Sequence, residues 1–267
     1  MKNSMIFTAL LSMLTALPAQ AETATRDMVA VSLIPGWRAA DGTHVAGLQV
    51  RLAPGWKTYW RSPGDAGIPP QIDWTGSGNL AAAAIRWPVP VTFDINGMTS
   101  VGYTRDVILP LVLTPQQAGG AMRLEAQVTL GVCETICVPV DVHVSADLTP
   151  AGTEPDARLV AALAQVPQTE GAARVGRVSC DVAATKDGLR LVAEVAMPPL
   201  GAAEFAVVET DDPDIWVGEA VSRRAGNSLR IETEMQHVAG QPLALDRSGL
   251  RFTVLAGARA VEIIGCD

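Results

Sequence analysis

The sequence contains few aromatic, basic and cysteine residues. Its 267 residues include only four Phe, two Tyr and six Trp, so a hydrophobic core must consist mainly of Val, Leu, Ala and Ile. The 28 Asp and Glu outnumber the 20 Lys and Arg, which gives a net charge of −8. Because nucleic acids and anionic membrane surfaces are themselves negative, this charge disfavours both as the main partner, and we expect no nucleic-acid binding.

Long apolar runs are also lacking. No segment beyond the N-terminus reaches the roughly 18 uninterrupted apolar residues of a membrane helix, so we expect no direct membrane span. The N-terminus has the pattern of a signal peptide: Lys2 is positive, residues 5–17 are apolar, and Ala19-Gln20-Ala21 precedes Glu22 as a cleavage site. No cysteine stands there to carry a lipid anchor. We therefore expect residues 1–21 to be removed after Ala21, leaving a soluble, exported, periplasmic protein.

The motifs of several large enzyme classes are absent. The sequence has no Ser-His-Asp arrangement, phosphate-binding loop or paired carboxylates, which argues against hydrolase or nucleotide chemistry, and we expect no cofactor. His44, His143 and His237 are scattered along the chain, and we interpret them as surface residues. A closed zinc site requires four ligands, and no such cluster is present in the sequence.

Short segments with a period of two predict a protein built almost entirely from β-strands. Turn sequences rich in Gly, Asp, Asn and Pro separate them. This pattern predicts an all-β fold with two immunoglobulin-like β-sandwich domains in tandem. The predicted strands are 28–35, 44–52, 71–74, 107–113, 178–183, 189–196, 205–209, 227–234, 250–255 and 260–264.

A change in composition marks the boundary between the two predicted domains. Residues 149–156 are rich in Pro, Gly, Thr and acidic residues, and residues 156–165 are alanine-rich and predict a short helix that Pro167 ends. We therefore expect a first domain at 22–148, a linker with a short helix at 149–174, and a second domain at 175–267.

The most informative stretch contains Cys133 and Cys137. The residues on either side alternate between apolar and polar, and the three-residue connection 134–136 predicts a β-hairpin. Cys133 shares its parity with Arg123 and Gln127, so we expect both cysteines on the polar face of the hairpin tip, opposite each other. The turn brings their Cα atoms within the range that a disulfide requires.

The other two cysteines predict a different kind of disulfide. A bridge across the five-residue loop would stabilise the fold by about 2 kcal/mol, whereas Cys180–Cys266 would close roughly 87 residues and contribute about 4.6 kcal/mol. Alternation also places Cys180 on an apolar face with Val178 and Val182. An exported chain meets the oxidant that forms such bonds. We therefore interpret Cys133–Cys137 as a reactive pair and Cys180–Cys266 as a structural disulfide.

Four motifs in order resemble a known family: Gly55-Trp56-Lys57-Thr58-Tyr59-Trp60-Arg61-Ser62-Pro63-Gly64-Asp65-Ala66-Gly67-Ile68-Pro69, Ile85-Arg86-Trp87-Pro88, Val101-Gly102-Tyr103, and Val132-Cys133-Glu134-Thr135-Ile136-Cys137-Val138-Pro139. The chain resembles the periplasmic N-terminal domain of DsbD-type thiol:disulfide interchange reductases. It is most similar to the ScsB-type branch, which is linked to suppression of copper sensitivity. The resemblance covers about residues 27–148, and the remainder only in architecture.

The resemblance implies an immunoglobulin-like domain that passes reducing equivalents to periplasmic thioredoxin-fold proteins. It further implies that Cys137 forms the bond to the partner and that Cys133 resolves it. Family members normally continue into a membrane electron-transfer domain and a thioredoxin-like domain, and this sequence contains neither. The resemblance therefore implies a separate membrane electron-transfer protein as the donor.

In the family, a loop after the Trp-Pro motif caps the active cysteines. The matching residues here are 93–97, with Phe93 as the expected shield and Asp94 and Asn96 beside it. Tyr59 and Tyr103 complete the candidate cap. The alternative interpretations are an ordinary turn at 93–97 and a core role for the aromatic residues Trp56, Tyr59 and Trp60.

Two alternatives for the short cysteine pair remain open at this point. It is either a purely structural disulfide or a site for Cu(I), a soft ion that thiolates bind, with Met98 as a third ligand. Under either alternative the protein is a periplasmic copper-handling or scaffold module and not a thiol:disulfide oxidoreductase.

Overall fold

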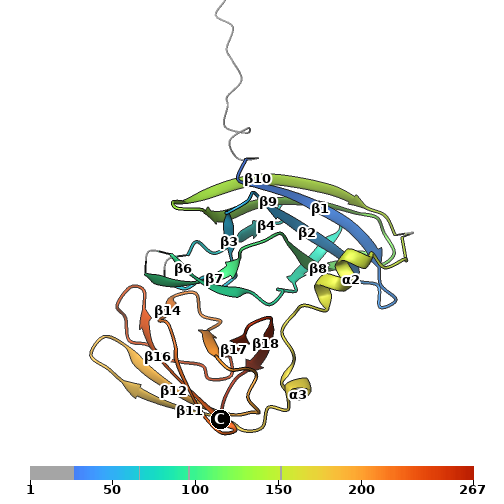
Figure 1. Ribbon diagram of the computed structural model, residues 1–267. Coiled ribbons are helices and arrows are strands. Elements are labelled where there is room, and N and C mark those ends of the chain that lie inside the picture. The colour runs from blue at the N-terminus through green and yellow to red at the C-terminus, as the bar shows by residue number, and fades with distance from the viewer. Residues whose placement is uncertain (1–26, 66, 96, 151) are drawn as a thin grey trace, which may run out of the picture.

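The computed structural model describes residues 27–65, 67–95, 97–150 and 152–267. The predicted signal peptide and Asn96 lie outside the described residues. Within them, the chain forms two β-sandwiches, one above the other in Figure 1, connected by a segment with two short helices. The predicted all-β fold class is confirmed. We refer to the part built from β1–β10 as the first sandwich and to β11–β18 as the second sandwich.

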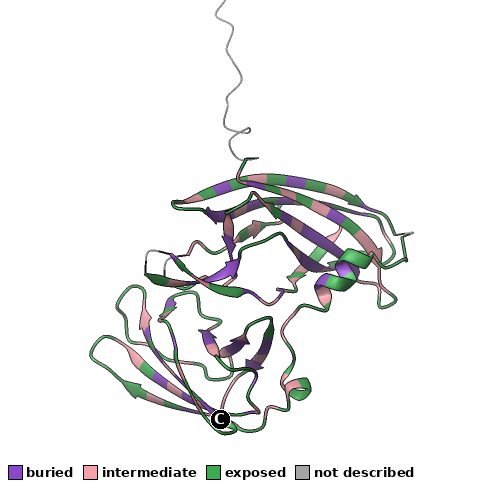
Figure 2. Ribbon diagram, in the orientation of Figure 1, coloured by how far each residue is buried: buried purple, intermediate pink, exposed green. Residues whose placement is uncertain are grey.

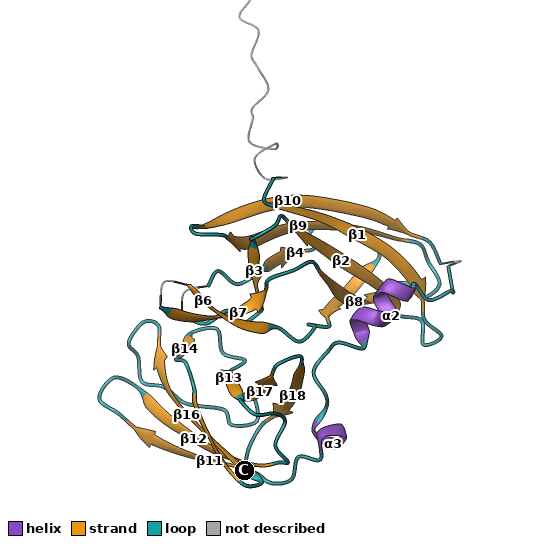
Figure 3. Cartoon of the chain, viewed as in Figure 1, coloured by secondary structure: helices purple, strands orange, loops and turns teal. Residues whose placement is uncertain are grey.

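The first sandwich has two antiparallel sheets, coloured as strands in Figure 3. One has the strand order β1-β2-β8-β5, and the other has the order β10-β9-β3-β7-β6, with β4 also paired to β9. The strands are β1 Val29–Arg38, β2 His44–Leu52, β3 Lys57–Tyr59, β4 Gln71–Asp73, β5 Leu80–Ile85, β6 Val91–Ile95, β7 Met98–Tyr103, β8 Val107–Pro115, β9 Met122–Cys133 and β10 Cys137–Leu148.

The second sandwich is smaller and also antiparallel. One sheet has the order β11-β12-β16-β14, with β15 also paired to β16, and the other has the order β13-β17-β18. The strands are β11 Val178–Ala184, β12 Leu189–Ala196, β13 Phe205–Glu209, β14 Ile215–Val217, β15 Val221–Ala225, β16 Ser228–His237, β17 Arg251–Ala256 and β18 Arg259–Ile264.

Alternation along β9 shows how the sequence builds the core. Leu124, Val128 and Leu130 are fully buried, while Arg123 and Gln127 at alternate positions are exposed, which gives the banded colouring of Figure 2. Successive side chains of a strand point to opposite faces, so an apolar residue at every second position buries one face only. The core of the first sandwich is therefore largely aliphatic, as the composition predicted.

The connecting segment is tied to both sandwiches. Helix α2, Ala157–Leu163, begins at Asp156, whose carboxylate accepts a hydrogen bond from the Arg158 amide, and its Leu159 is buried against β1 and β2. The helix predicted at 156–165 is thus confirmed. Helix α3, Glu170–Ala173, follows, and Gln168 between the helices pairs with Val261 of β18.

Several short strands were not predicted. Strand β5 has the sequence Leu-Ala-Ala-Ala-Ala-Ile, whose alanines have low β-propensity, and it forms because it pairs with β8 at the sheet edge. Strands β3, β7, β14 and β15 were missed as well. Such segments become strands because they pair with strands that are distant in the sequence, and the local sequence does not indicate this pairing.

The prediction that His44 is a surface residue is wrong. His44 begins β2 and is 2% exposed, and its Nε2 lies 2.6 Å from the Pro35 carbonyl oxygen, to which it donates. The turn between β1 and β2 brings the imidazole under the bulged end of β1. Burial lowers the pKa of His44 below its ordinary value, because it penalises the charged imidazolium.

Candidate functional site

The Cys133–Cys137 disulfide closes the tip of the long hairpin formed by β9 and β10. The two strands pair continuously from Met122 and Leu148 at the open end to Cys133 and Cys137 at the tip, with residues 134–136 as the connection. The two cysteines are direct partners in this register, and their Cα atoms are 4.1 Å apart. The hairpin and its three-residue connection thus follow the prediction from the sequence.

The cysteines are less exposed than predicted. Cys133 does share its side of β9 with Arg123 and Gln127, but it is 0% exposed, and Cys137 is half-buried. Tyr59 at the end of β3 and Ile68 between β3 and β4 cover the tip, because they pack in one cluster with Cys133 and lie against Gly131. The polar face of β9 is therefore exposed or half-buried from Arg123 to Thr129 and buried at Gly131 and Cys133.

Gly131 is the residue that permits this cover. It lies two positions before Cys133 on the same face, and a Cβ atom there would stand 2.8 Å from Tyr59 Cδ2 and 2.6 Å from Ile68 Cβ. Only a residue without a side chain allows both groups to approach so closely. The interruption of the polar pattern by Gly131 is the sequence signal that the polar-face prediction overlooked.

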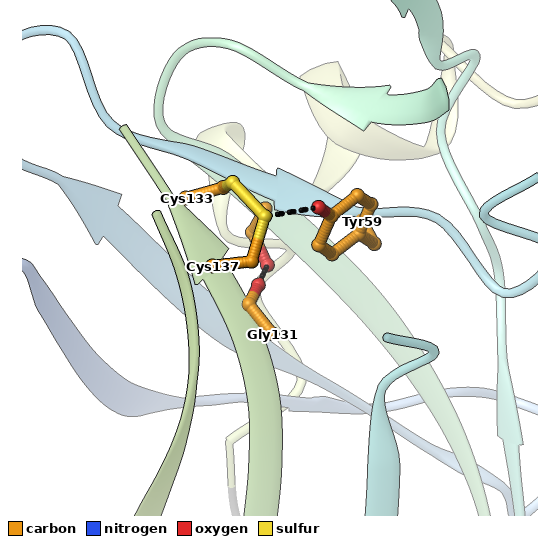
Figure 4. Close-up of a disulfide and its surroundings, with 5 residues drawn as sticks. Tyr59, Gly131, Cys133 and Cys137 are labelled. Carbon is orange, nitrogen blue, oxygen red and sulfur yellow. Dashed lines mark hydrogen bonds between the residues drawn. A yellow bond between two sulfur atoms is a disulfide. The ribbon is translucent and has the colours of Figure 1, made fainter. Parts of the chain in front are cut away.

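Tyr59 provides the direct polar contact to the disulfide. Its hydroxyl lies 3.0 Å from Cys137 Sγ, and a dashed line in Figure 4 marks this hydrogen bond. A disulfide sulfur carries no proton, so the phenol must be the donor. The adjacent Thr58 fixes this arrangement, because its hydroxyl donates to the Gly131 carbonyl at 2.9 Å. Burial raises the pKa of Tyr59, so the phenol stays protonated at neutral pH.

The hairpin of β6 and β7 forms the apolar part of the cover. Phe93 and Ile95 of β6 pack in one cluster with Tyr59, Cys133 and Cys137, and the rings of Phe93 and Tyr59 have centroids 6.2 Å apart. Asp94 points away from this cluster by alternation, and its carboxylate accepts a hydrogen bond from the Gly97 amide. Asp94 therefore supports the turn, and Phe93 contacts the site.

The structure separates the other aromatic candidates from the disulfide. Tyr103 is buried in the main core of the first sandwich, where its hydroxyl donates to the Pro88 carbonyl at 2.9 Å. Trp60 is fully buried in the same core, and Trp56 packs against it. Tyr59 and Trp60 are neighbours in an extended segment and so point to opposite sides. Of the three aromatic residues at 56–60, Tyr59 alone belongs to the cluster around the cysteines.

The two sulfurs have unequal surroundings. Cys133 is enclosed, whereas Cys137 is half-buried and follows the exposed Ile136, which is 75% accessible. An incoming thiolate must approach the disulfide along the bond axis and reach one sulfur. Of the two cysteines, Cys137 is the less enclosed residue.

The second disulfide links Cys180 on β11 to Cys266 after β18, with Cα atoms 5.7 Å apart. Cys180 is 4% exposed and lies in the core of the second sandwich. Its amide donates to the Asp267 carbonyl, and its carbonyl accepts from Arg247. The bond thus connects the first strand of this sandwich to the end of the chain.

Two further observations concern groups outside the disulfides. In the described part of the chain, no three His, Cys, Asp or Glu side chains come together in a way that could hold a metal ion. None of the described helices is long and apolar enough to cross a membrane.

Comparison with known proteins finds one matching family and similar solved structures. Residues 30–149 match the family described as thiol:disulfide interchange protein DsbD, N-terminal. The crystal structure of the N-terminal periplasmic domain of ScsB from Proteus mirabilis superposes with a TM-score of 0.60 at 25% identity, covering 90% of this chain and 92% of that chain. No curated protein matches the chain significantly.

One further solved structure is a protein of unknown function from Porphyromonas gingivalis W83. It covers 88% of this chain and 97% of its own, at 12% identity and a TM-score of 0.22, too low for an argument about fold or function. The DsbD and ScsB matches support a thiol:disulfide interchange-type function and suggest a periplasmic domain.

Proposed function

We propose, from the premise that residues 30–149 form a DsbD-type N-terminal domain near that of ScsB, that the protein passes reducing equivalents through Cys133 and Cys137 to thioredoxin-fold partners in the periplasm. In this proposal Cys137 forms the bond to the partner and Cys133 resolves it. The disulfide form described above is the oxidised product of one such transfer.

The transfer begins from the reduced pair. The Cys137 thiolate attacks one sulfur of the partner disulfide, a mixed disulfide forms, and the partner's other sulfur leaves as a thiolate. The Cys133 thiolate then attacks Cys137, which restores the Cys133–Cys137 bond and releases the partner's second thiolate. The pair loses two electrons and two protons, and the partner gains both as a dithiol.

The single observation that carries this proposal is the Tyr59 hydroxyl at 3.0 Å from Cys137 Sγ. A protonated phenol that donates to sulfur stabilises the thiolate form of Cys137, which is both the attacking species and the leaving group in the reverse reaction. A structural disulfide has no need of such a donor. The half-open position of Cys137 beside the enclosed Cys133 supports the same assignment.

The proposal requires a source of electrons and an export route. A dithiol on a membrane electron-transfer protein would reduce the disulfide by the same exchange in reverse, with attack at Cys137. The signal peptide at residues 1–21, cleaved after Ala21, would deliver the chain to the periplasm.

A trapping experiment tests the roles of the two cysteines. The reduced Cys133→Ser variant is mixed with oxidised thioredoxin as a thioredoxin-fold probe. We expect a mixed disulfide through Cys137, because this variant can attack but cannot resolve. The adduct is identified on a non-reducing gel and its linkage is mapped by mass spectrometry.

The Cys137→Ser variant is the matched control, since it keeps only the enclosed Cys133 and should trap little probe. Equal trapping by the two variants would contradict the assignment of roles. Absence of any adduct, together with failure of the reduced wild-type protein to reduce oxidised thioredoxin, would reject the exchange function. No contact among the described residues favours the alternative of a Cu(I) site over this proposal.

A further inference from the structure

Arg61 connects the segment that carries Tyr59 to the second sandwich. Its guanidinium donates to both carboxylate oxygens of Glu209 at 2.9 Å and to Glu262 at 2.6 Å. Its side chain is only 15% exposed. A buried cation with two carboxylate partners and bidentate geometry fixes the position of its own backbone much more firmly than a surface ion pair does.

The residues next to Arg61 transmit this anchor to the cover of the disulfide. Tyr59 lies two residues earlier, and two contacts hold Trp60 between them. The Trp60 amide donates a hydrogen bond to the Val101 carbonyl at 2.9 Å, and the Arg61 guanidinium lies 4.1 Å from the centre of the Trp60 ring. The Val101 amide in turn donates to the Pro63 carbonyl at 2.9 Å. Trp60 and Pro63 are therefore hydrogen-bonded to Val101 of β7, and β7 pairs with β6, the strand that carries Phe93.

The second sandwich also supports β7 directly. Val207 of β13 belongs to the same buried cluster as Val101 of β7, although the two residues come from different sandwiches. Thr99 and Val101 of β7 face Phe205 and Ala220 across a small cavity between the sandwiches. Both parts of the cover, the Tyr59 segment and the β6–β7 hairpin, thus rest on the second sandwich.

We propose that the second sandwich holds the cover of the Cys133–Cys137 disulfide in place, and that Arg61 is the positioning residue through which it does so. If the contacts of Arg61 are lost, Tyr59 and Phe93 lose a fixed support, and the disulfide becomes more accessible to reductant. This inference gives a role to the second sandwich that the exchange reaction itself does not require.

The Arg61→Ala variant tests the proposal. We measure the rate at which dithiothreitol reduces Cys133–Cys137 in the folded protein, by alkylation and mass mapping. We expect an increase of about threefold or more, the range that coupling energies between contacting residues produce. The Glu209→Gln/Glu262→Gln variant should show the same change, because it removes the anchor from the other side.

Arg224→Ala is the matched control. Arg224 makes a comparably buried bidentate pair with Glu204 at 2.7 Å, but within the second sandwich, and among the described residues no hydrogen bond or ion pair joins it to the Tyr59 segment. It should lower the stability of the second sandwich and leave the rate of Cys133–Cys137 reduction unchanged. A double-mutant cycle between Arg61 and Glu209 should show non-additive effects on that rate.

Two results would overturn the proposal: equal acceleration by Arg61→Ala and Arg224→Ala, or no acceleration by either the Arg61 or the glutamate variants. If Arg61→Ala does not fold, the glutamate variant decides alone. The biological role of this support rests on the proposed function, whereas the support itself does not. The dithiothreitol rate needs no protein partner, so failure here is distinguishable from failure to trap thioredoxin.

Discussion

The two disulfides are similar in burial and differ in what surrounds them. In each pair one cysteine is almost fully buried, Cys133 or Cys180, and its partner is half-buried. The Cys133–Cys137 sulfurs lie against a phenol hydroxyl and an aromatic cover, whereas Cys180 lies in the core of the second sandwich with its backbone bonded to Asp267 and Arg247. Burial alone would therefore not distinguish a reactive disulfide from a structural one.

The difference that matters is what each bond constrains and what stabilises its thiolate. Cys133–Cys137 spans four residues of a hairpin that β-sheet pairing already defines, so the fold loses little when it opens. Cys180–Cys266 spans 86 residues and connects β11 to the segment that follows β18. A donor to sulfur is present only at the first pair in the described structure.

The largest expected effect comes from removing each disulfide in turn. The Cys180→Ala/Cys266→Ala variant should lose about 4–5 kcal/mol of unfolding free energy, and the Cys133→Ala/Cys137→Ala variant about 2 kcal/mol, because the longer loop gains more entropy when opened. Denaturant unfolding at one pH measures both. A larger loss of unfolding free energy on removing Cys133–Cys137 than on removing Cys180–Cys266 would contradict the interpretation of Cys180–Cys266 as the structural disulfide.

The next effect concerns the donor at Cys137. In a Cys133→Ser background, Tyr59→Phe should raise the pKa of Cys137, because the thiolate loses a hydrogen bond. At pH 7 the alkylation rate should then fall by up to about tenfold, and the pH dependence of the rate with iodoacetamide reports the shift.

Tyr103→Phe is the control for this experiment, since Tyr103 is the other tyrosine and its hydroxyl binds the Pro88 carbonyl. It should leave the pKa of Cys137 unchanged. An identical alkylation profile for Tyr59→Phe and the parent would show that the phenol does not tune the sulfur.

Removal of the apolar cover should have a moderate effect. Phe93→Ala should increase the rate at which the reduced pair reacts with a small thiol reagent by about threefold, because the ring no longer shields the sulfurs. Asp94→Ala changes the turn next to it without touching the cluster and should react at nearly the parent rate. An unchanged rate for Phe93→Ala would make residues 93–97 an ordinary turn.

The smallest effect is a pH dependence of stability that belongs to the first sandwich. The pKa of buried His44 is lowered on folding, so the unfolded chain binds more protons than the folded chain below about pH 6.5. Stability should therefore be highest above this pH and decrease as the pH falls toward the folded-state pKa. The decrease in unfolding free energy between pH 7.5 and 5.5 should be smaller in His44→Gln than in the parent protein. An equal decrease in both proteins would contradict the assignment of this pH dependence to His44.

The sequence predicted the elements that depend on local pattern. The β9–β10 hairpin, the strand His44–Leu52 and helix α2 follow from alternation, turn residues and an alanine-rich segment that Pro167 ends, all of which act over a few positions. The prediction also placed Phe93 and Tyr59 among the candidate cap residues. The Tyr59 hydroxyl contacts Cys137 Sγ, and Phe93 packs in the same cluster as the two cysteines.

The remaining features depend on contacts between distant segments. The enclosure of Cys133 results from Tyr59 and Ile68, which pack against Gly131 from 72 and 63 residues away in the chain, and alternation within β9 does not report this. Tyr103 shares a family motif with the site yet packs in the main core. Arg61 is separated in the sequence from Glu209 by 148 residues and from Glu262 by 201 residues, so no local pattern could indicate these ion pairs.

The most direct test of the division of labour is graded reduction of the native protein. The protein is incubated with increasing dithiothreitol, alkylated, and mapped by mass spectrometry for all four cysteines. Our account predicts that Cys133 and Cys137 are labelled first, and that Cys180 and Cys266 are labelled only when the protein unfolds. Equal labelling of all four cysteines at low reductant, or earlier labelling of Cys180 and Cys266, would contradict it.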